Sequence, residues 1–306
     1  HEGKAVFVRG ALPGEHVRAV RTARHRQYDE ARVDAVLAAS PDRVEPRCVH
    51  FGTCGGCALQ HLAPAAQIAA KARTLMENLE RIGHVRPGRE LAPLASEAWG
   101  YRRRARLSVK RVDKKGRVLV GFREVDGRFV ADIARCEVLH PAVGGRIEEL
   151  ALLVESLDAR REIPQIEVAV GDELAALVLR HLGPLTDADR ERLVAFARDS
   201  GLAIYLQPGG LDSVQALHPP DAALSFRLPR HDIRFEFRPL DFVQVNASLN
   251  ERMVDHALEL LAPGPADRVL DLFCGLGNFT LPLARRAARV VGVEGEAGLV
   301  ARARDN

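Results

Sequence analysis

The stretch RVLDLFCGLGNFTLPLARRAARVVGVEG, residues 268–295, decides the fold of the C-terminal part of this chain. Its apolar run VLDLF has the composition of a buried strand, a glycine turn and a helical segment follow, and VVGV reads as a second strand. Strand, glycine turn, helix and strand form half of a doubly wound nucleotide-binding domain. We therefore predict an incomplete Rossmann-like domain over residues 241–306.

The glycine turn predicts a ligand site at the start of the following helix. Gly275 and Gly277 permit close backbone approach, and Asn278 lies where that helix is expected to begin. Glu294 ends the second strand, where a carboxylate can accept hydrogen bonds from both hydroxyls of an adenosine ribose. Thr280 stands where a nicotinamide-binding turn requires a third small residue. The pattern therefore favours S-adenosylmethionine over a nicotinamide cofactor.

Two further features adjoin this turn. Cys274 lies at its rim, and we interpret it as a small buried thiol beneath the ligand rather than a nucleophile. The run FVQVN, residues 242–246, predicts a strand with Phe242, Gln244 and Asn246 on one face. That face could meet the cofactor or a base; the alternative is an ordinary edge strand whose Asn246 caps the next helix.

Three of the five cysteines lie together in CVHFGTCGGC, residues 48–57. Cys48, Cys54 and Cys57 have the spacing C-x5-C-x2-C, and Cys136 lies far downstream. Zinc ribbons usually bring two C-x2-C pairs, whereas a four-iron cluster often takes three thiolates from one loop and one from elsewhere. The spacing favours an iron–sulfur cluster and leaves zinc open. Because four thiolates would close the site, we expect a structural or RNA-shaping cluster rather than a catalytic one.

Composition limits the class of protein. A chain of 306 residues that is 47% hydrophobic predicts a soluble protein of several domains. No apolar run approaches the roughly 18 residues of a membrane helix, and no signal segment opens the chain, so we expect a cytoplasmic protein. An odd number of cysteines argues against a disulfide framework. The chain begins at His1 without methionine and stops at Asn306 within a helical pattern, which indicates a fragment.

Periodicity divides the rest of the chain. We expect a small β-barrel or meander over residues 1–43 and a central α+β domain over residues 44–240, the latter with the cysteine loop. The main predicted strands are 4–9, 15–21, 30–38, 101–111, 117–123, 128–133 and 241–246. Predicted helices are 64–81, one opening with a threonine cap at residue 186, and one opening with a capping box of Ser248 and Glu251.

A basic stretch follows the cysteine loop. Residues 101–123 hold ten Lys or Arg against one acid, although the net charge of the whole chain is only +3. If residues 101–111 form a strand, Arg102, Arg104, Arg106 and Lys110 share one face, a row suited to a polyanion. An ordinary solvated strand face is the alternative. This clustering is the local signal for RNA binding.

Together these pieces resemble a known family, the bacterial RNA uracil-5-methyltransferases that carry a TRAM domain and a [4Fe-4S] cluster, most closely the 23S rRNA branch. The resemblance rests on FVRGALPGEHV, SPDRVEPRCVHFGTCGGCALQHL, YRRRARL, GFRE, FVQVN and DLFCGLGNFTLPLA, spread over nearly the whole chain. It implies an OB-like TRAM barrel over residues 1–43 and an incomplete class I methyltransferase domain over residues 241–306.

The resemblance also implies roles for individual residues. The implied ligands of the [4Fe-4S] cluster are Cys48, Cys54, Cys57 and Cys136. The implied contacts of S-adenosylmethionine are Gln244, Phe273, Asn278 and Glu294. The family's catalytic cysteine and proton-abstracting acid are expected beyond Asn306, so this stretch is expected to bind and not to catalyse.

The implied reaction explains why a cysteine is needed. Thiolate addition at C6 of uracil makes an enolate whose C5 attacks the methyl group, and a base then removes the C5 proton. The target uridine must be flipped or unpaired. A tRNA uracil-5-methyltransferase and a non-catalytic iron–sulfur RNA-binding module remain alternatives. A radical methylthiotransferase is disfavoured by the cysteine spacing, and the sequence indicates neither the target uridine nor an oligomeric state.

Overall fold

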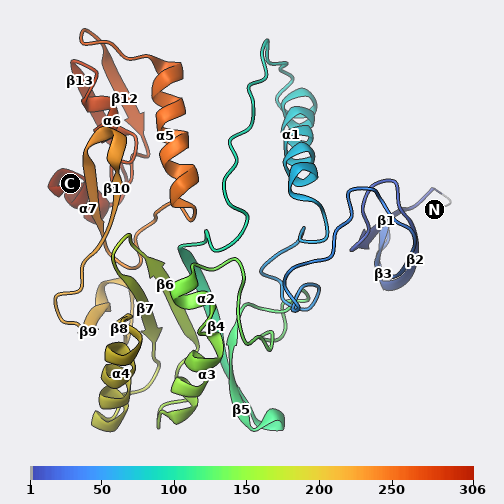
Figure 1. The fold of residues 1–306 in the computed structure, drawn as a ribbon, viewed down its shortest axis with the longest axis horizontal. Coiled ribbons are helices and arrows are strands. Elements are labelled where there is room, and N and C mark those ends of the chain that lie inside the picture. The colour runs from blue at the N-terminus through green and yellow to red at the C-terminus, as the bar shows by residue number, and fades with distance from the viewer. Residues whose placement is uncertain (1–2) are drawn as a thin grey trace. The chain divides into compact units, whose positions relative to one another are not determined.

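The computed structural model describes residues 3–306, and the chain forms two compact units, His1–Pro93 and Leu94–Asn306 (Figure 1). The first unit holds both the predicted barrel and the cysteine loop. The three domains predicted from the sequence stay a prediction. No helix within residues 3–306 is long and apolar enough to cross a lipid bilayer.

The first unit contains a three-stranded sheet. Its strands are β1 (Ala5–Arg9), β2 (His16–Arg24) and β3 (Tyr28–Ala38), in the order β1-β3-β2. β3 pairs antiparallel with β2 and parallel with β1. All three strands were predicted, and so was the following helix α1 (Pro64–Arg81), which starts with proline in its first turn.

The carboxylate of Glu15 connects this sheet by hydrogen bonds to the segment that leads to the cysteine loop. Its oxygens accept hydrogen bonds from the backbone N–H groups of Leu12 and Ser40, at 2.8 and 3.2 Å. Arg43 donates to them from Nε and Nη2 at 2.5 and 2.7 Å. The Arg43 hydrogen bonds are the main reason that the pKa of Glu15 falls to about 2. The buried carboxylate is therefore ionised and fully partnered.

The second unit is built on a six-stranded sheet. In spatial order its strands are β5 (Arg117–Gly121), β4 (Arg104–Val112), β6 (Gln165–Val170), β7 (Ala175–Arg180), β8 (Ala203–Gln207) and β9 (Gln215–His218). All neighbours are antiparallel except β7 and β8, which the helix α4 (Asp187–Ser200) connects as a parallel pair. α4 carries the predicted cap, a capping box of Thr186 and Asp189. The helices α2 (Pro141–Gly144) and α3 (Ile147–Ser156) precede β6.

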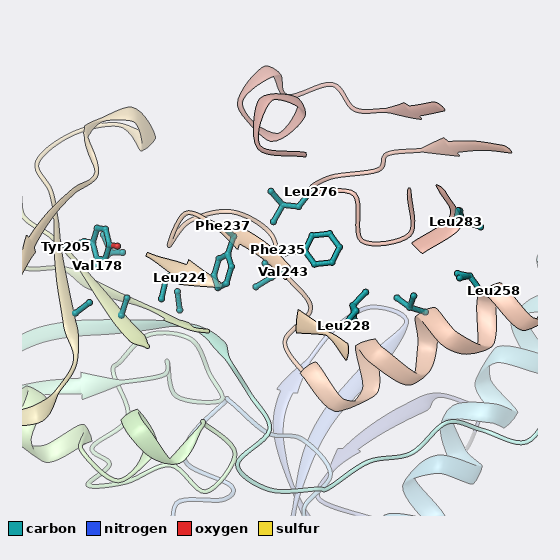
Figure 2. Packing of buried hydrophobic residues seen from close by; sticks show 14 residues of the cluster. Val178, Tyr205, Leu224, Leu228, Phe235, Phe237, Val243, Leu258, Leu276 and Leu283 are labelled. Carbon is teal, nitrogen blue, oxygen red and sulfur yellow. The ribbon is translucent and has the colours of Figure 1, made fainter. Parts of the chain in front are cut away.

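An apolar core joins this sheet to the C-terminal part of the unit (Figure 2). The hairpin of β10 (Leu224–Leu228) and β11 (Ile233–Phe237) lies between them. The cluster runs from Val178 and Tyr205 on the sheet through Phe235 to Leu258 and Leu276. All of these side chains are at most 7% exposed, so the two regions share one continuous core.

The C-terminal part follows the predicted order of elements. Its elements are α5 (Ala247–Leu261), β12 (Arg268–Leu272), α6 (Thr280–Ala284), β13 (Arg289–Val293) and α7 (Ala297–Asp305). β12 and β13 pair in parallel, as the strands of a doubly wound half must. Short 3-10 turns occur at Asp113–Lys115, Leu211–Ser213 and Pro229–His231.

Three predictions about elements were wrong. Residues 128–133 form no strand, and only an isolated bridge joins Arg123 to Val130 around an intervening turn. The segment 241–246 is not a strand either, because only its end is held in backbone pairing. α5 is capped by the side chain of Asn246, which accepts from the N–H of Leu249 at 3.0 Å, and not by the predicted capping box.

Candidate functional site

The glycine turn between β12 and α6 has a strained backbone. Phe273, the first residue after β12, has a φ of 60°, which is uncommon for a residue with a side chain. Gly275 and Gly277 have φ values of 55° and 89°. A Cβ on Gly277 would also lie 3.1 Å from Cγ of Leu281. The turn needs glycine at these positions, and it presents Phe273, which is 89% exposed, to solvent.

Glu294 closes this turn from the neighbouring strand. It follows β13 directly, and its Oε2 accepts the N–H of Gly275 at 3.1 Å. Its Oε1 accepts the N–H groups of Gly295 at 2.7 Å and Glu296 at 3.1 Å. These hydrogen bonds, chiefly those from Glu296 and Gly275, lower the pKa of Glu294 below its ordinary value. They occupy about three of the four acceptor positions of the carboxylate, which leaves about one for a ligand hydroxyl rather than the two expected.

Asn278 is held by a residue that the sequence reasoning missed. Asn250 of α5 and Asn278 exchange two side-chain hydrogen bonds, each 2.9 Å long. Asn250 is 5% exposed and lies on the same buried stripe of the helix as Val254 and Leu258. A polar residue on an apolar stripe requires a partner, and that signal could have identified Asn250. The pair leaves Asn278 one N–H and one acceptor position for a ligand.

Cys274 is half-buried and packs against β13; its predicted place beneath the ligand stays a prediction. A Cβ on Gly292 of β13 would lie 2.9 Å from its Sγ and 3.1 Å from Oγ1 of Thr280. Thr280 in turn donates to Asp271 at 2.5 Å. Burial raises the pKa of the Cys274 thiol, so the thiol stays protonated near neutral pH. This agrees with a packing role and not with a nucleophile.

Gln244 lies in the irregular segment before α5. It is exposed, as is Phe242, while Val243 between them points into the apolar core. The predicted alternation of faces therefore holds only as far as Gln244, because Val245, predicted to share the face of Val243, is exposed as well. Phe273, Asn278 and Glu294 are gathered around the glycine turn, and Gln244 is linked to them through α5 and its Asn250–Asn278 pair.

The cysteine loop belongs to the first unit. Its backbone turns through hydrogen bonds from the N–H of Phe51 to the carbonyl of Cys48 and from the N–H of Cys54 to that of His50, at 3.0 and 2.9 Å. Cys136 belongs to the second unit, where its N–H donates to the carbonyl of Gly144 at 2.8 Å. No cysteine forms a disulfide. Within residues 3–306, no group of three His, Cys, Asp or Glu side chains is arranged as a metal site.

Two local features of the loop region are a hydrogen bond to a cysteine sulfur and a buried imidazole. The N–H of Gly56 points to Sγ of Cys54 at 3.4 Å, as backbone donors do toward thiolates that hold a cluster. His61, whose ring lies 5.2 Å from that of Phe51, is 5% exposed. Neither of its ring nitrogens has a hydrogen-bond partner within the described residues, and burial lowers its pKa. A buried imidazole normally has such a partner.

The four predicted RNA-binding side chains have different surroundings. Arg106 and Lys110 of β4 are exposed, and Arg106 also pairs with Glu167 at 2.6 Å. Arg102 lies over the ring of Phe122 at 5.4 Å and donates to the carbonyl of Arg104 at 2.9 Å. Arg104 is half-buried and donates to the carbonyl of Pro239. The structure therefore places two of the four on the surface.

Comparisons with known proteins identify relatives of this chain. Residues 223–306 match the family model described as tRNA (Uracil-5-)-methyltransferase. A protein of Stenotrophomonas maltophilia K279a, named 23S rRNA (uracil(1939)-C(5))-methyltransferase RlmD, is 62% identical over 304 residues. That match covers 99% of this chain and 68% of the relative. A protein of the same name from Xanthomonas axonopodis pv. citri is 60% identical over the same shares of both chains.

One solved structure shares the fold. It is the tRNA (uracil-54, C5)-methyltransferase of Pyrococcus abyssi in complex with S-adenosyl-L-homocysteine, 22% identical to this chain. The match covers 99% of this chain and 71% of that one, with a TM-score of 0.72. The multidomain α/β fold is thus that of a known uracil-5-methyltransferase. On the identity and coverage of the curated relatives, this chain belongs to the RlmD family of 23S rRNA (uracil(1939)-C(5))-methyltransferases.

Proposed function

We propose that the protein methylates C5 of uracil 1939 in 23S rRNA, with S-adenosylmethionine as the methyl donor. The observation that carries the proposal is the glycine turn closed by Glu294 and braced by Asn250, in a chain 62% identical to an RlmD protein. The turn offers carboxylate, amide and aromatic groups at the carboxyl ends of two parallel strands, where doubly wound folds bind ligands.

Each predicted cofactor residue has a role that its surroundings permit. S-adenosylmethionine would supply an electrophilic methyl group when bound. Glu294 would accept one ribose hydroxyl at its remaining acceptor position, and Asn278 would offer one donor and one acceptor. The exposed ring of Phe273 would pack on an aromatic base, and the amide of Gln244 would contact the cofactor from the segment before α5.

We assign a [4Fe-4S] cluster to Cys48, Cys54, Cys57 and Cys136. The support is the spacing of the four thiols and the N–H of Gly56 at Sγ of Cys54. With four thiolate ligands no iron would be open to substrate, so the cluster would brace the fold.

The chemistry on uracil requires a thiolate and a base. Neither group is assigned to a residue of this chain, and the raised pKa of Cys274 argues against that thiol as the nucleophile. We assign RNA contacts to the exposed Arg106 and Lys110 and to the three-stranded sheet of β1, β2 and β3. Arg102 contributes less to this surface, because its guanidinium is engaged with Phe122.

The test is a methyl-transfer assay on the protein extended to the length of its relatives. Labelled S-adenosylmethionine is supplied with unmodified 23S rRNA or with unmodified tRNA in separate reactions, and the labelled nucleotide is mapped. We expect label on C5 of uracil 1939 of 23S rRNA only. Label on tRNA would support the tRNA activity that the family model names, and label on neither RNA would support a non-catalytic RNA-binding module.

A further inference from the structure

Residues 239–246 form no strand, and their one backbone bridge is at Asn246. The segment contains Gln244, the proposed cofactor contact. A loop that presents a ligand contact must be held by its surroundings, because an unordered loop loses conformational entropy when it binds. One short run, Arg102–Arg104 within the predicted basic stretch, contacts both ends of this segment.

The start of the segment is held by a guanidinium. Arg104, the first residue of β4, donates from Nη1 to the carbonyl oxygen of Pro239. The next turn is closed by Asp241, whose carboxylate accepts the N–H of Arg238 at 2.7 Å and Nη2 of Arg302 at 2.6 Å. The hydrogen bond from Arg104 therefore attaches this turn to the start of β4.

The end of the segment is held by backbone groups of the same run. The N–H of Arg103 donates to the carbonyl oxygen of Val245 at 2.8 Å, and Arg102 forms an isolated bridge with Asn246. Asn246 also donates from Nδ2 to Oγ of Ser96 at 2.7 Å. Gln244 thus lies between two attachment points whose partners are adjacent in sequence.

The surroundings of Arg104 differ from those of an RNA-binding arginine. Burial lowers its pKa, and the carboxylates of Glu167 and Asp241 oppose that shift. A charged donor in such a place makes a strong hydrogen bond to a carbonyl and has little freedom to reach a phosphate. Arg106, two residues along the same strand, keeps 69% of its side chain exposed.

We propose that Arg104 is a positioning residue that orients the Gln244 segment for cofactor binding, and that it does not contact RNA. The inference rests on the proposed role of Gln244 as a cofactor contact. The two arginines of the basic stretch then have different roles. Arg104 holds the segment that contacts the cofactor, and Arg106 contacts RNA.

The test compares Arg104→Met with Arg106→Met in the extended protein. Calorimetry with S-adenosylhomocysteine measures the cofactor site, and filter binding with a 23S rRNA fragment measures the RNA site. Arg104→Met should weaken S-adenosylhomocysteine binding about tenfold, as loss of a hydrogen bond from a charged group does, with unchanged RNA affinity. Arg106→Met should weaken RNA binding, reduce its salt dependence, and leave S-adenosylhomocysteine affinity unchanged. The opposite pattern would overturn the proposal.

A double-mutant cycle separates positioning from general destabilisation. Gln244→Ala alone should weaken S-adenosylhomocysteine binding, and adding Arg104→Met to it should cost less than about threefold more, because the two changes remove one interaction. Full additivity would overturn the positioning role while leaving Gln244 in the site. No effect of Gln244→Ala would instead overturn the proposed cofactor contact.

If Arg104→Met does not fold, the same measurements are made on Arg104→Lys. Lysine keeps the charge and one donor but not the geometry of the guanidinium, so an intermediate loss of S-adenosylhomocysteine affinity is expected, again with unchanged RNA affinity. Unchanged S-adenosylhomocysteine affinity together with weaker RNA binding would assign Arg104 to the RNA and overturn the proposal.

Discussion

The cysteine loop (residues 48–57) and the glycine turn (residues 273–278) are both short, glycine-containing loops that the sequence singles out, yet they are organised differently. The glycine turn is completed within one unit, by the carboxylate of Glu294 and the amide of Asn250. The cysteine loop is organised by local backbone hydrogen bonds, from Phe51 to Cys48 and from Cys54 to His50. The glycine turn is thus held by side chains from outside it, whereas the cysteine loop is held by hydrogen bonds of its own backbone.

The largest expected effect is at the cysteine loop. Anaerobically purified protein should contain about four irons and four sulfides per chain, and Cys54→Ala should lose most of them because one thiolate per iron is needed. Iron and sulfide analysis with visible absorption measures the change. Cys274→Ala is the matched control and should keep the cluster. Stoichiometric zinc without a visible chromophore would contradict the assignment.

The second effect tests the preformed turn. Glu294→Ala removes three backbone hydrogen bonds and the proposed ribose contact, so S-adenosylhomocysteine affinity by calorimetry should fall about tenfold or more. Glu296→Ala is the control, since that carboxylate caps α7 by accepting from Gly298 and Leu299. Glu296→Ala should reduce S-adenosylhomocysteine affinity less than Glu294→Ala does. Equal affinity of wild type and Glu294→Ala would remove Glu294 from the site.

A smaller effect is expected for the brace behind the turn. Asn250→Ala deletes one half of the amide pair and should weaken S-adenosylhomocysteine binding about three- to tenfold through a misplaced Asn278. Combining it with Asn278→Ala should add little, because both changes break the same pair. Additive losses in calorimetry would show that Asn250 acts independently of Asn278.

The smallest expected effect is a change in thermal stability caused by Glu15, and it depends on pH. The pKa of Glu15 in the folded protein is about 2, below its ordinary value of 4.5, so the ionised group stabilises the fold above pH 4.5. That contribution should be lost progressively as pH falls from 4.5 toward 2. Thermal melts of wild type against Glu15→Gln should converge over this range. Glu77→Gln on the exposed surface of α1 is the control and should leave the melting profile parallel to wild type.

Local signals in the sequence predicted much of the fold. The boundaries of α1, the capping of α4 by Thr186 and the order from β12 to β13 all follow from caps, prolines and apolar periodicity within a few residues. The segment 241–246 was mistaken for a strand because polar and apolar residues alternate in its sequence, whereas in the structure Val245 is exposed and only the end of the segment has backbone partners. Period-two exposure reports which side chains are buried and not whether the backbone has a partner.

The sequence by itself determined the family, the cysteine spacing and the glycine turn that Glu294 closes, because residue type and spacing carry those signals. Only the tertiary structure decided that Asn250 braces Asn278, and that Arg104 turns to Pro239 while Arg106 faces solvent. The two arginines are equivalent in sequence, two positions apart on one strand face. Their partners come from residues more than fifty positions away, and a hydrogen bond over that separation depends on how the chain packs.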